Sequence, residues 1–131
     1  MSLDPLGHIT LLVSNFKKSK KFYSGLLDFV GYKIATDELD SAGWASKEGF
    51  GFWIKPSKET KDTYKFDSPG IHHICFKARA KEEVDKLYTE YLLKNKIYIF
   101  DKPAQYPEYT PDYYAVYFAD PDGIKLEFAW Y

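Results

Sequence analysis

The chain contains little arginine, cysteine or histidine, and it has no long apolar run. Arg79 is the only arginine among the 18 cationic residues. A site in which arginine binds carboxylates or phosphates through two parallel hydrogen bonds is therefore not expected. Cys75 is the only cysteine, which excludes an internal disulfide and favours a reducing, cytoplasmic setting. No segment approaches about 18 apolar residues and no secretion signal precedes the first strand, so we expect no membrane association.

The overall charge is close to neutral. The 131 residues carry a net charge of −1, and 45% of them are hydrophobic. This length and composition predict one ordinary domain, and the lack of a basic excess makes nucleic acid a poor partner. Aromatic residues, by contrast, make up 19% of the chain, with 12 tyrosines. They favour a pocket for a ring-bearing or apolar small molecule, although many aromatic side chains will simply belong to the core.

The chain consists of two similar halves. The segment "GHI" at 7–9 recurs as "HHI" at 72–74, and "EGFGFWI" at 48–54 aligns with "DGIKLEF" at 122–128. Apolar periodicity predicts a strand, a helix and three strands in each half. In the first half these are a strand at 8–13, a helix from Ser14 or Asn15 to Gly31, and strands at about 31–36, 42–47 and 50–55. In the second half they are a strand at 71–78, a helix at 81–94, and strands at about 97–101, 113–119 and 124–130.

The pattern therefore predicts an α+β fold of two βαβββ modules in tandem. Module one covers about 7–55, a polar connector covers 56–70, and module two covers about 71–131. Neither half can bury its own sheet face well, so we expect both to fold as one domain. Two curved mixed sheets would then form a cleft, with the helices outside.

Alternation along the strands assigns the polar residues to one face of each sheet. Successive side chains on a strand point to opposite faces, so His8, His73, Glu127 and Trp53 all lie opposite the apolar set. His72 would point away from them and is interpreted as structural. Two imidazoles and one carboxylate are the ligands of a divalent-metal site with open positions. The alternative is that these groups are only hydrogen-bonded within the protein.

The segment 101–118 is the most unusual part of the sequence. Its prolines at 103, 107 and 111 predict a stiff excursion that could act as a lid or pocket wall. Equally, its aromatic side chains could cover a sheet edge and contact a second copy in a homodimer. The tyrosines on this segment are Tyr106, Tyr109, Tyr113, Tyr114 and Tyr117.

Three segments together resemble the vicinal-oxygen-chelate superfamily, which includes glyoxalases, bleomycin-resistance proteins, fosfomycin-resistance transferases and extradiol dioxygenases. They are "GHITLLVSNFKKSKKFYSGLLDFVGYKIA", "GIHHICFKARAKEEVDKLY" and "YYAVYFADPDGIKLEF". The resemblance implies a divalent metal (Fe, Mn, Ni or Zn) on His8, His73 and Glu127. It places Trp53 at the fourth ligand position, which an indole cannot fill.

The same resemblance implies a glyoxalase-like lyase or isomerase, or dioxygenase-like chemistry, on a small oxygen-chelating substrate. Tyr117 matches a substrate-contacting tyrosine of the dioxygenases, but the extra non-ligand histidine of those enzymes has no counterpart. Glu127 would shuttle a proton, or Tyr117 would donate one. The alternative is a metal-free protein that sequesters an aromatic ligand, as bleomycin-resistance proteins do. The expected substrate-binding residues are Trp53, Tyr109, Tyr114 and Tyr117.

Overall fold

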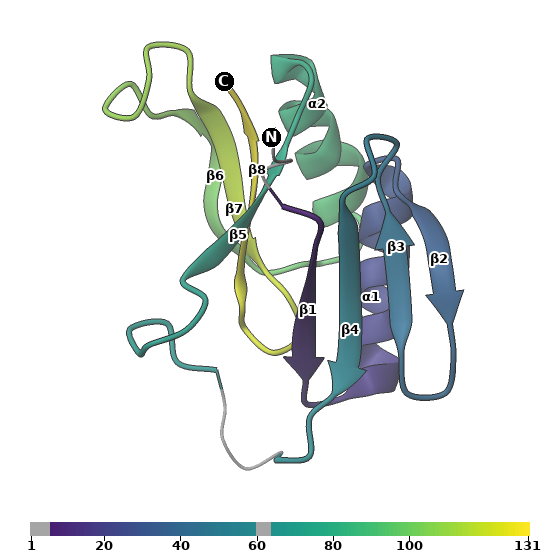
Figure 1. Ribbon diagram of the computed structural model, residues 1–131. Coiled ribbons are helices and arrows are strands. Elements are labelled where there is room, and N and C mark those ends of the chain that lie inside the picture. Colours follow the sequence, from purple (N-terminus) through teal and green to yellow (C-terminus); the bar gives the residue numbers. More distant parts are fainter. Residues whose placement is uncertain (1–5, 60–63) are drawn as a thin grey trace, which may run out of the picture. The chain divides into compact units, whose positions relative to one another are not determined.

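The computed structural model describes residues 6–59 and 64–131, and it divides the chain into two compact units. Unit 1 is Met1–Thr63 and unit 2 is Tyr64–Tyr131. Each unit contains a four-stranded mixed sheet and one helical segment (Figure 1). The predicted βαβββ order is therefore confirmed in both halves. The common cleft and the folding of both modules as one domain stay predictions.

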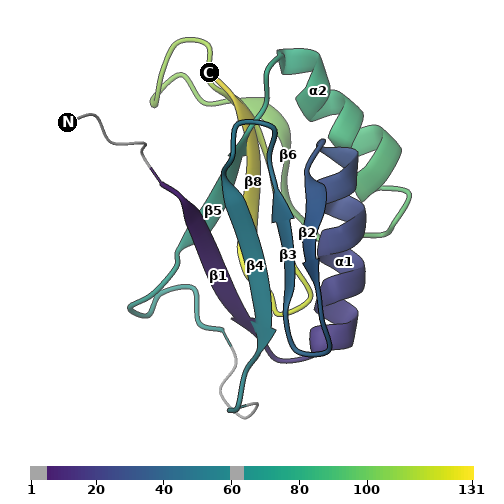
Figure 2. The ribbon, with the colours of Figure 1, turned by 45° about the vertical axis from the view of Figure 1, so that its right-hand side comes forward.

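In unit 1 the strands have the order β1-β4-β3-β2, with β1 and β4 parallel and the other pairs antiparallel. Helix α1 lies along one face of this sheet (Figure 2). The Asn15 side chain caps the helix by accepting a hydrogen bond from the Lys18 backbone N–H at 3.0 Å, and Gly31 follows its end with φ 93°. The elements are β1 (His8–Val13), α1 (Phe16–Phe29), β2 (Lys33–Asp37), β3 (Ala42–Ala45) and β4 (Gly51–Pro56).

Unit 2 repeats this topology. Its strand order is β5-β8-β7-β6, again with the first pair parallel and the others antiparallel. The register confirms the repeat, because His8 pairs with Gly51 in unit 1 and His73 pairs with Lys125 in unit 2. The elements are β5 (His73–Lys77), α2 (Lys81–Lys86), η1 (Leu87–Leu92), β6 (Ile99–Gln105), β7 (Tyr114–Ala119) and β8 (Lys125–Trp130).

The buried apolar residues lie where the alternation predicts them. In unit 1 the side chains of Leu11, Val13, Phe52 and Ile54 are buried on one face of the sheet. In unit 2 Phe76, Leu126 and Phe128 are buried on the corresponding strands, together with Val84 and Leu87 of the helical segment. Each module therefore buries one face of its sheet beneath its helix, which leaves the other face for polar and aromatic side chains.

Several strand ends shift by one or two residues, so that β5 begins at His73 where a strand from 71 was predicted, and two elements differ more. The helix expected at 81–94 is α-helical only to Lys86 and continues as a π-helix, η1. The strand expected at about 97–101 runs on to Gln105 and passes through Pro103. Its pairing with β7 shifts register between Asp101 and Ala104, and a proline is tolerated at such an irregularity because no ladder hydrogen bond is required there. The excursion that carries the tyrosines is therefore shorter than predicted.

No helix in residues 6–59 or 64–131 has the length and apolar character needed to cross a membrane.

A buried carboxylate and a tyrosine cluster as candidate functional site

The sheet of unit 2 has two different faces at β7. The Tyr114 hydroxyl donates a hydrogen bond to the Asp85 carboxylate of α2 at 2.7 Å, so Tyr114 lies on the face that the helix covers. Tyr117 is three residues further along β7 and so points to the opposite face. Tyr113 immediately precedes β7, and its hydroxyl reaches Glu127 on that same opposite face. That opposite face carries the candidate site.

Glu127 lies at the centre of this site and is only 1% exposed. Its Oε2 is 3.1 Å from Nε2 of His73, on the neighbouring strand β5. Its Oε1 accepts a hydrogen bond from the Tyr113 hydroxyl at 2.7 Å, and the Tyr117 hydroxyl also hydrogen-bonds this carboxylate. Burial of a carboxylate is costly unless partners satisfy it, and here both oxygens have partners within unit 2.

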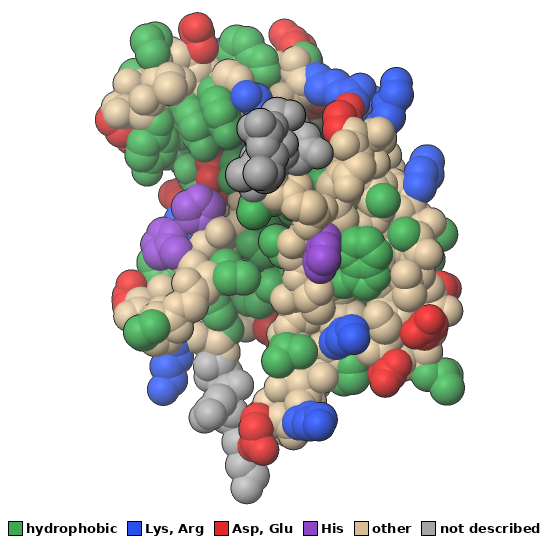
Figure 3. Space-filling model, viewed as in Figure 1, with side chains coloured by type: hydrophobic (Ala, Val, Ile, Leu, Met, Phe, Trp, Pro, Cys, Tyr) green, Lys and Arg blue, Asp and Glu red, His purple; other side chains and the backbone are tan. Residues whose placement is uncertain are grey.

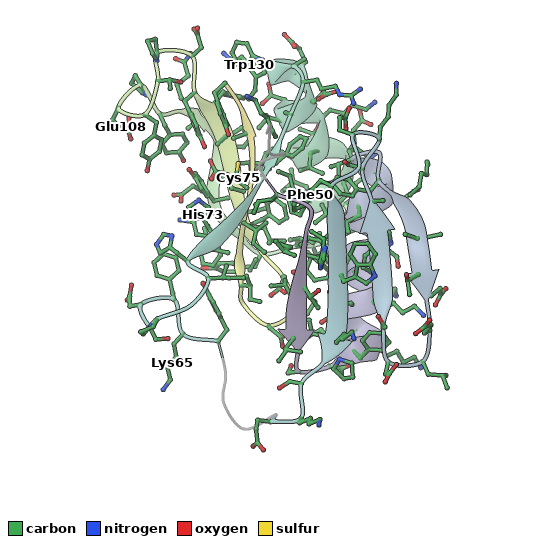
Figure 4. All side chains as sticks on the ribbon, viewed as in Figure 1. Phe50, Lys65, His73, Cys75, Glu108 and Trp130 are labelled. Atoms are coloured by element: carbon green, nitrogen blue, oxygen red, sulfur yellow. The ribbon has the colours of Figure 1, made fainter. Side chains whose placement is uncertain are left out.

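These surroundings keep the nearby acids neutral. Burial is the main cause that raises the pKa of Tyr113 and that of Tyr117 far above the usual value, and the hydrogen bond to Glu127 is the second. The pKa of Cys75 is raised to about 12, mainly by burial around Sγ and secondly by the charge of Glu127. Another part of this residue is exposed at the surface. Both phenols are therefore hydrogen donors over the whole physiological range. Figure 4 shows His73 and Cys75 on the same strand.

Tyrosine side chains extend the site beyond the carboxylate. Tyr106 packs edge-on against Tyr117, with ring centroids 5.4 Å apart, and lies nearly parallel to Tyr109 at 6.1 Å. Tyr113 stacks on Tyr131 at 4.8 Å. Tyr106 and Tyr113 also pack against a small buried cluster formed by Ala115, Tyr117 and Ala129. Figure 3 shows hydrophobic side chains gathered at this end of unit 2, around the β6–β7 loop, where Figure 4 labels Glu108.

Unit 1 carries the other predicted site residues, His8 and Trp53. Their rings meet edge to face with centroids 5.6 Å apart. A Cβ atom on Gly43 would lie 2.1 Å from Nε1 of Trp53, and one on Gly51 would lie 1.9 Å from its Cζ3. The indole therefore lies flat across two glycines on neighbouring strands, and both must lack a side chain for it to do so.

The structure brings together some of the predicted site residues. His73, Glu127 and Tyr117 meet in unit 2, and Tyr109 joins them through Tyr106. Tyr114, expected to bind substrate, is on the helix-covered face, where Asp85 holds its hydroxyl. Tyr114 and Tyr117 are three residues apart on β7 and so point to opposite faces of the sheet, and a substrate-binding role for Tyr114 stays a prediction.

Sequence reasoning missed Tyr113 and misjudged His72. The predicted strand at 113–119 put Tyr113 on the face of Tyr117, which was the one signal for it. Tyr113 lies just before β7, however, and its hydrogen bond to Glu127 is what places it on this face. His72 was expected to point away from His73, but it precedes β5 and the alternation of a strand does not apply to it. Its Nδ1 lies 2.7 Å from Nδ1 of His73.

His73 and Glu127 have the spacing of two ligands of one metal ion. An ion about 2.0–2.2 Å from both atoms, with a bond angle near 90°, sets adjacent donors about 3 Å apart, and the observed separation is 3.1 Å. The other oxygen of Glu127 accepts a hydrogen bond from Tyr113, and the other ring nitrogen of His73 contacts His72. Metal ligands in proteins are typically held by such partners. In residues 6–59 and 64–131, however, no three His, Cys, Asp or Glu side chains are grouped to hold an ion. The contribution of His8 stays a prediction.

The sequence places the chain in a known superfamily that has this fold. The sequence model of the Glyoxalase/Bleomycin resistance protein/Dioxygenase superfamily matches residues 5–128, and the chain belongs to this superfamily. Among relatives, it is 30% identical over 122 residues to the uncharacterized protein YqjT of Bacillus subtilis, covering 92% of this chain and 94% of that protein. It is also 30% identical over 129 residues to the metallothiol transferase FosB of Lysinibacillus sphaericus, covering 98% and 83%.

Solved structures of the same superfamily share the fold. A glyoxylase/bleomycin resistance protein/dioxygenase domain from Frankia sp. EAN1pec has a TM-score of 0.78 at 21% identity, with 98% of each chain covered. The fosfomycin resistance protein FosX from Listeria monocytogenes has a TM-score of 0.71 at 20% identity, with 99% of this chain and 95% of that chain covered.

Proposed function

We propose that this protein is a metal-dependent enzyme that acts on a small oxygen-chelating substrate with aromatic or apolar character. The observation that carries the proposal is the pairing of His73 with the buried Glu127 at the spacing of two metal ligands. His8, at the equivalent position of the first module, is proposed as the third protein ligand. The names of FosB, a metallothiol transferase, and of the superfamily, which includes glyoxalases and dioxygenases, support this choice.

A bound divalent metal would act as a Lewis acid, accepting substrate oxygens and stabilising the negative charge that develops on them. The protein's own residues would orient the ligands and the substrate. Tyr113 holds one oxygen of Glu127, so the other stays directed towards His73. Tyr117 is a neutral phenol that hydrogen-bonds the carboxylate, and we propose that its hydrogen turns from Glu127 to a substrate oxygen when the substrate binds.

Aromatic groups would provide the walls for the substrate. Tyr109 is 62% exposed at the rim of the tyrosine cluster, where its ring is available for stacking. Trp53 presents a flat indole supported by Gly43 and Gly51. Stacking on such rings contributes about 0.5–1.5 kcal/mol beyond the area buried, which favours a substrate with a planar or apolar part.

The second candidate is a metal-free binding protein. Both oxygens of Glu127 already accept hydrogen bonds or contact a ring nitrogen within unit 2, so the carboxylate is satisfied without an ion. In this alternative His8, His73 and Glu127 are hydrogen-bonding groups, and the tyrosines hold an aromatic ligand by stacking.

Metal analysis of untagged protein tests the choice. Protein prepared without chelator, and again after addition of Mn, Fe, Ni or Zn salts followed by desalting, is analysed by elemental mass spectrometry. The proposal expects about one metal per chain. Glu127→Gln and the double variant His8→Ala/Glu127→Gln should lose it, with circular dichroism confirming the fold.

Glu108→Gln is the matched control, because Glu108 is an exposed carboxylate on the β6–β7 loop and should have no effect on metal content. Well below one metal per chain in the wild type with every salt would support the metal-free binding protein instead. A double variant that still binds one metal per chain would contradict the proposed ligands.

A further inference from the structure

His72 and His73 are neighbours in the sequence whose rings meet. Their Nδ1 atoms are 2.7 Å apart, a hydrogen-bond distance, and their ring planes are inclined by 74°. The contact is available because β5 begins at His73, so His72 lies in a segment where side chains do not have to alternate. His73 therefore contacts Glu127 through one ring nitrogen and His72 through the other.

The preceding segment holds His72 in place although it is exposed. The Tyr64 hydroxyl is 2.8 Å from the backbone carbonyl oxygens of both Ile71 and His72 and donates its hydrogen to them. The Phe66 ring packs on the His72 imidazole with centroids 4.1 Å apart. A freely moving surface histidine has no such support, and these contacts direct its Nδ1 towards His73.

The contact between the two Nδ1 atoms couples the tautomers of the rings. When both imidazoles are neutral, one hydrogen lies between the two nitrogens, and one ring donates while the other accepts. If Nε2 of His73 donates to Glu127, its Nδ1 must accept from His72. If the lone pair of Nε2 is free to bind a metal, the hydrogen of His73 is on Nδ1, and His72 must accept it.

We propose that His72 is a positioning residue for His73, which fixes the orientation of that ring and accepts its Nδ1 hydrogen when Nε2 binds a metal. The metal-binding part of this inference rests on the proposed function, whereas the orientation of the ring does not. Partners of this kind, hydrogen-bonded to the second nitrogen of a ligand histidine, typically change metal affinity 10- to 100-fold when they are removed.

Two substitutions separate the hydrogen bond from the bulk of the ring. His72→Phe keeps a ring to pack on Phe66 but has no atom that accepts a hydrogen bond. His72→Asn loses the ring but places an amide oxygen at the same number of bonds from the backbone as Nδ1. Zn²⁺ alone is titrated into each protein by calorimetry, and thermal melts check that each variant is folded.

We expect His72→Phe to weaken Zn²⁺ binding 10- to 100-fold, with His72→Asn within about threefold of the wild type. A second measurement needs no metal. In metal-free protein, three-bond couplings report the side-chain rotamers of His73. One rotamer is expected in the wild type and in His72→Asn, and a mixture in His72→Phe.

The outcomes distinguish the two proposals. If the wild type binds Zn²⁺ and His72→Phe binds it equally well, the positioning role is overturned and the proposed function stands. If the wild type does not bind Zn²⁺, the proposed function fails, and the rotamers alone decide. A single His73 rotamer in His72→Phe then overturns the positioning role, whereas a mixture supports it.

Discussion

Replacing Tyr113 by phenylalanine removes one hydroxyl and leaves the ring that stacks on Tyr131. That hydroxyl donates at 2.7 Å to Oε1 of Glu127, which is 1% exposed. A hydrogen bond to a charged group contributes about 1.5–3 kcal/mol, whereas removing the whole partner of a buried ion pair costs about 3–5 kcal/mol. Because His73 and Tyr117 remain beside the carboxylate, we expect the lower range. The free energy of unfolding should fall by about 2 kcal/mol.

Urea denaturation of metal-free protein measures this change. The midpoint should fall while the slope with denaturant stays constant, because Tyr113→Phe alters no large buried surface. Tyr98→Phe is the matched control. Its side chain is 68% exposed, so loss of its hydroxyl should change the free energy of unfolding by less than about 0.5 kcal/mol.

A double-mutant cycle shows whether the charge of Glu127 is the cause. In a Glu127→Gln background no buried charge remains to be satisfied, so adding Tyr113→Phe should cost clearly less than it does alone. The expected coupling is about 1 kcal/mol or more. If Tyr113→Phe is as stable as Tyr98→Phe, or if the two costs simply add, the hydroxyl does not stabilise this carboxylate and the account of the site is wrong.

Three further predictions concern single positions. Since the pKa of Cys75 is about 12, very little of this side chain is thiolate, the reactive form, at pH 8. Iodoacetamide should therefore alkylate Cys75 about a hundredfold more slowly than a free thiol, a figure that allows for the greater intrinsic nucleophilicity of a thiolate with a high pKa. A difference of less than tenfold would contradict the burial of its sulfur. Ser19 has a buried hydroxyl without a hydrogen-bond partner in the described part of the chain. Ser19→Ala removes this unsatisfied group from a helix and should raise the free energy of unfolding by about 1 kcal/mol. A loss of stability in urea denaturation would refute this. Gly51→Ala should displace the Trp53 indole, change the tryptophan fluorescence and lower the free energy of unfolding by about 1–3 kcal/mol. Gly7→Ala is the control, because nothing lies within 4 Å of its added Cβ, and it should leave the fluorescence unchanged. Equal spectra for both variants would show that the indole does not rest on Gly51.

The residues of regular strands were predictable from the sequence, because a period of two is a strong constraint once one face is apolar. It assigned Glu127 and His73 to one face, and the structure brings them together. Both residues lie in paired strands whose register is regular, so nothing local overrides the alternation.

Prediction failed where that regularity ends. His72 precedes β5 by one residue, and its ring orientation is set by Tyr64 and Phe66, which are distant from any strand pattern. Pro103 suggested the end of a strand, but an irregular pairing in β6 accommodates it. The depth at which Glu127 is buried was also not visible in the sequence, since it depends on how the tyrosines pack above it.

The support beneath Trp53 has a consequence for how this protein can vary. An indole at position 53 requires Gly43 and Gly51 together, and a shorter side chain at position 53 would leave bare backbone on β3 and β4 exposed to water. The three positions are thus linked, and exchanging any one of them in isolation carries a penalty. Relatives with a smaller side chain at position 53 should therefore tolerate larger side chains at the other two, a covariation that can be sought wherever this domain occurs.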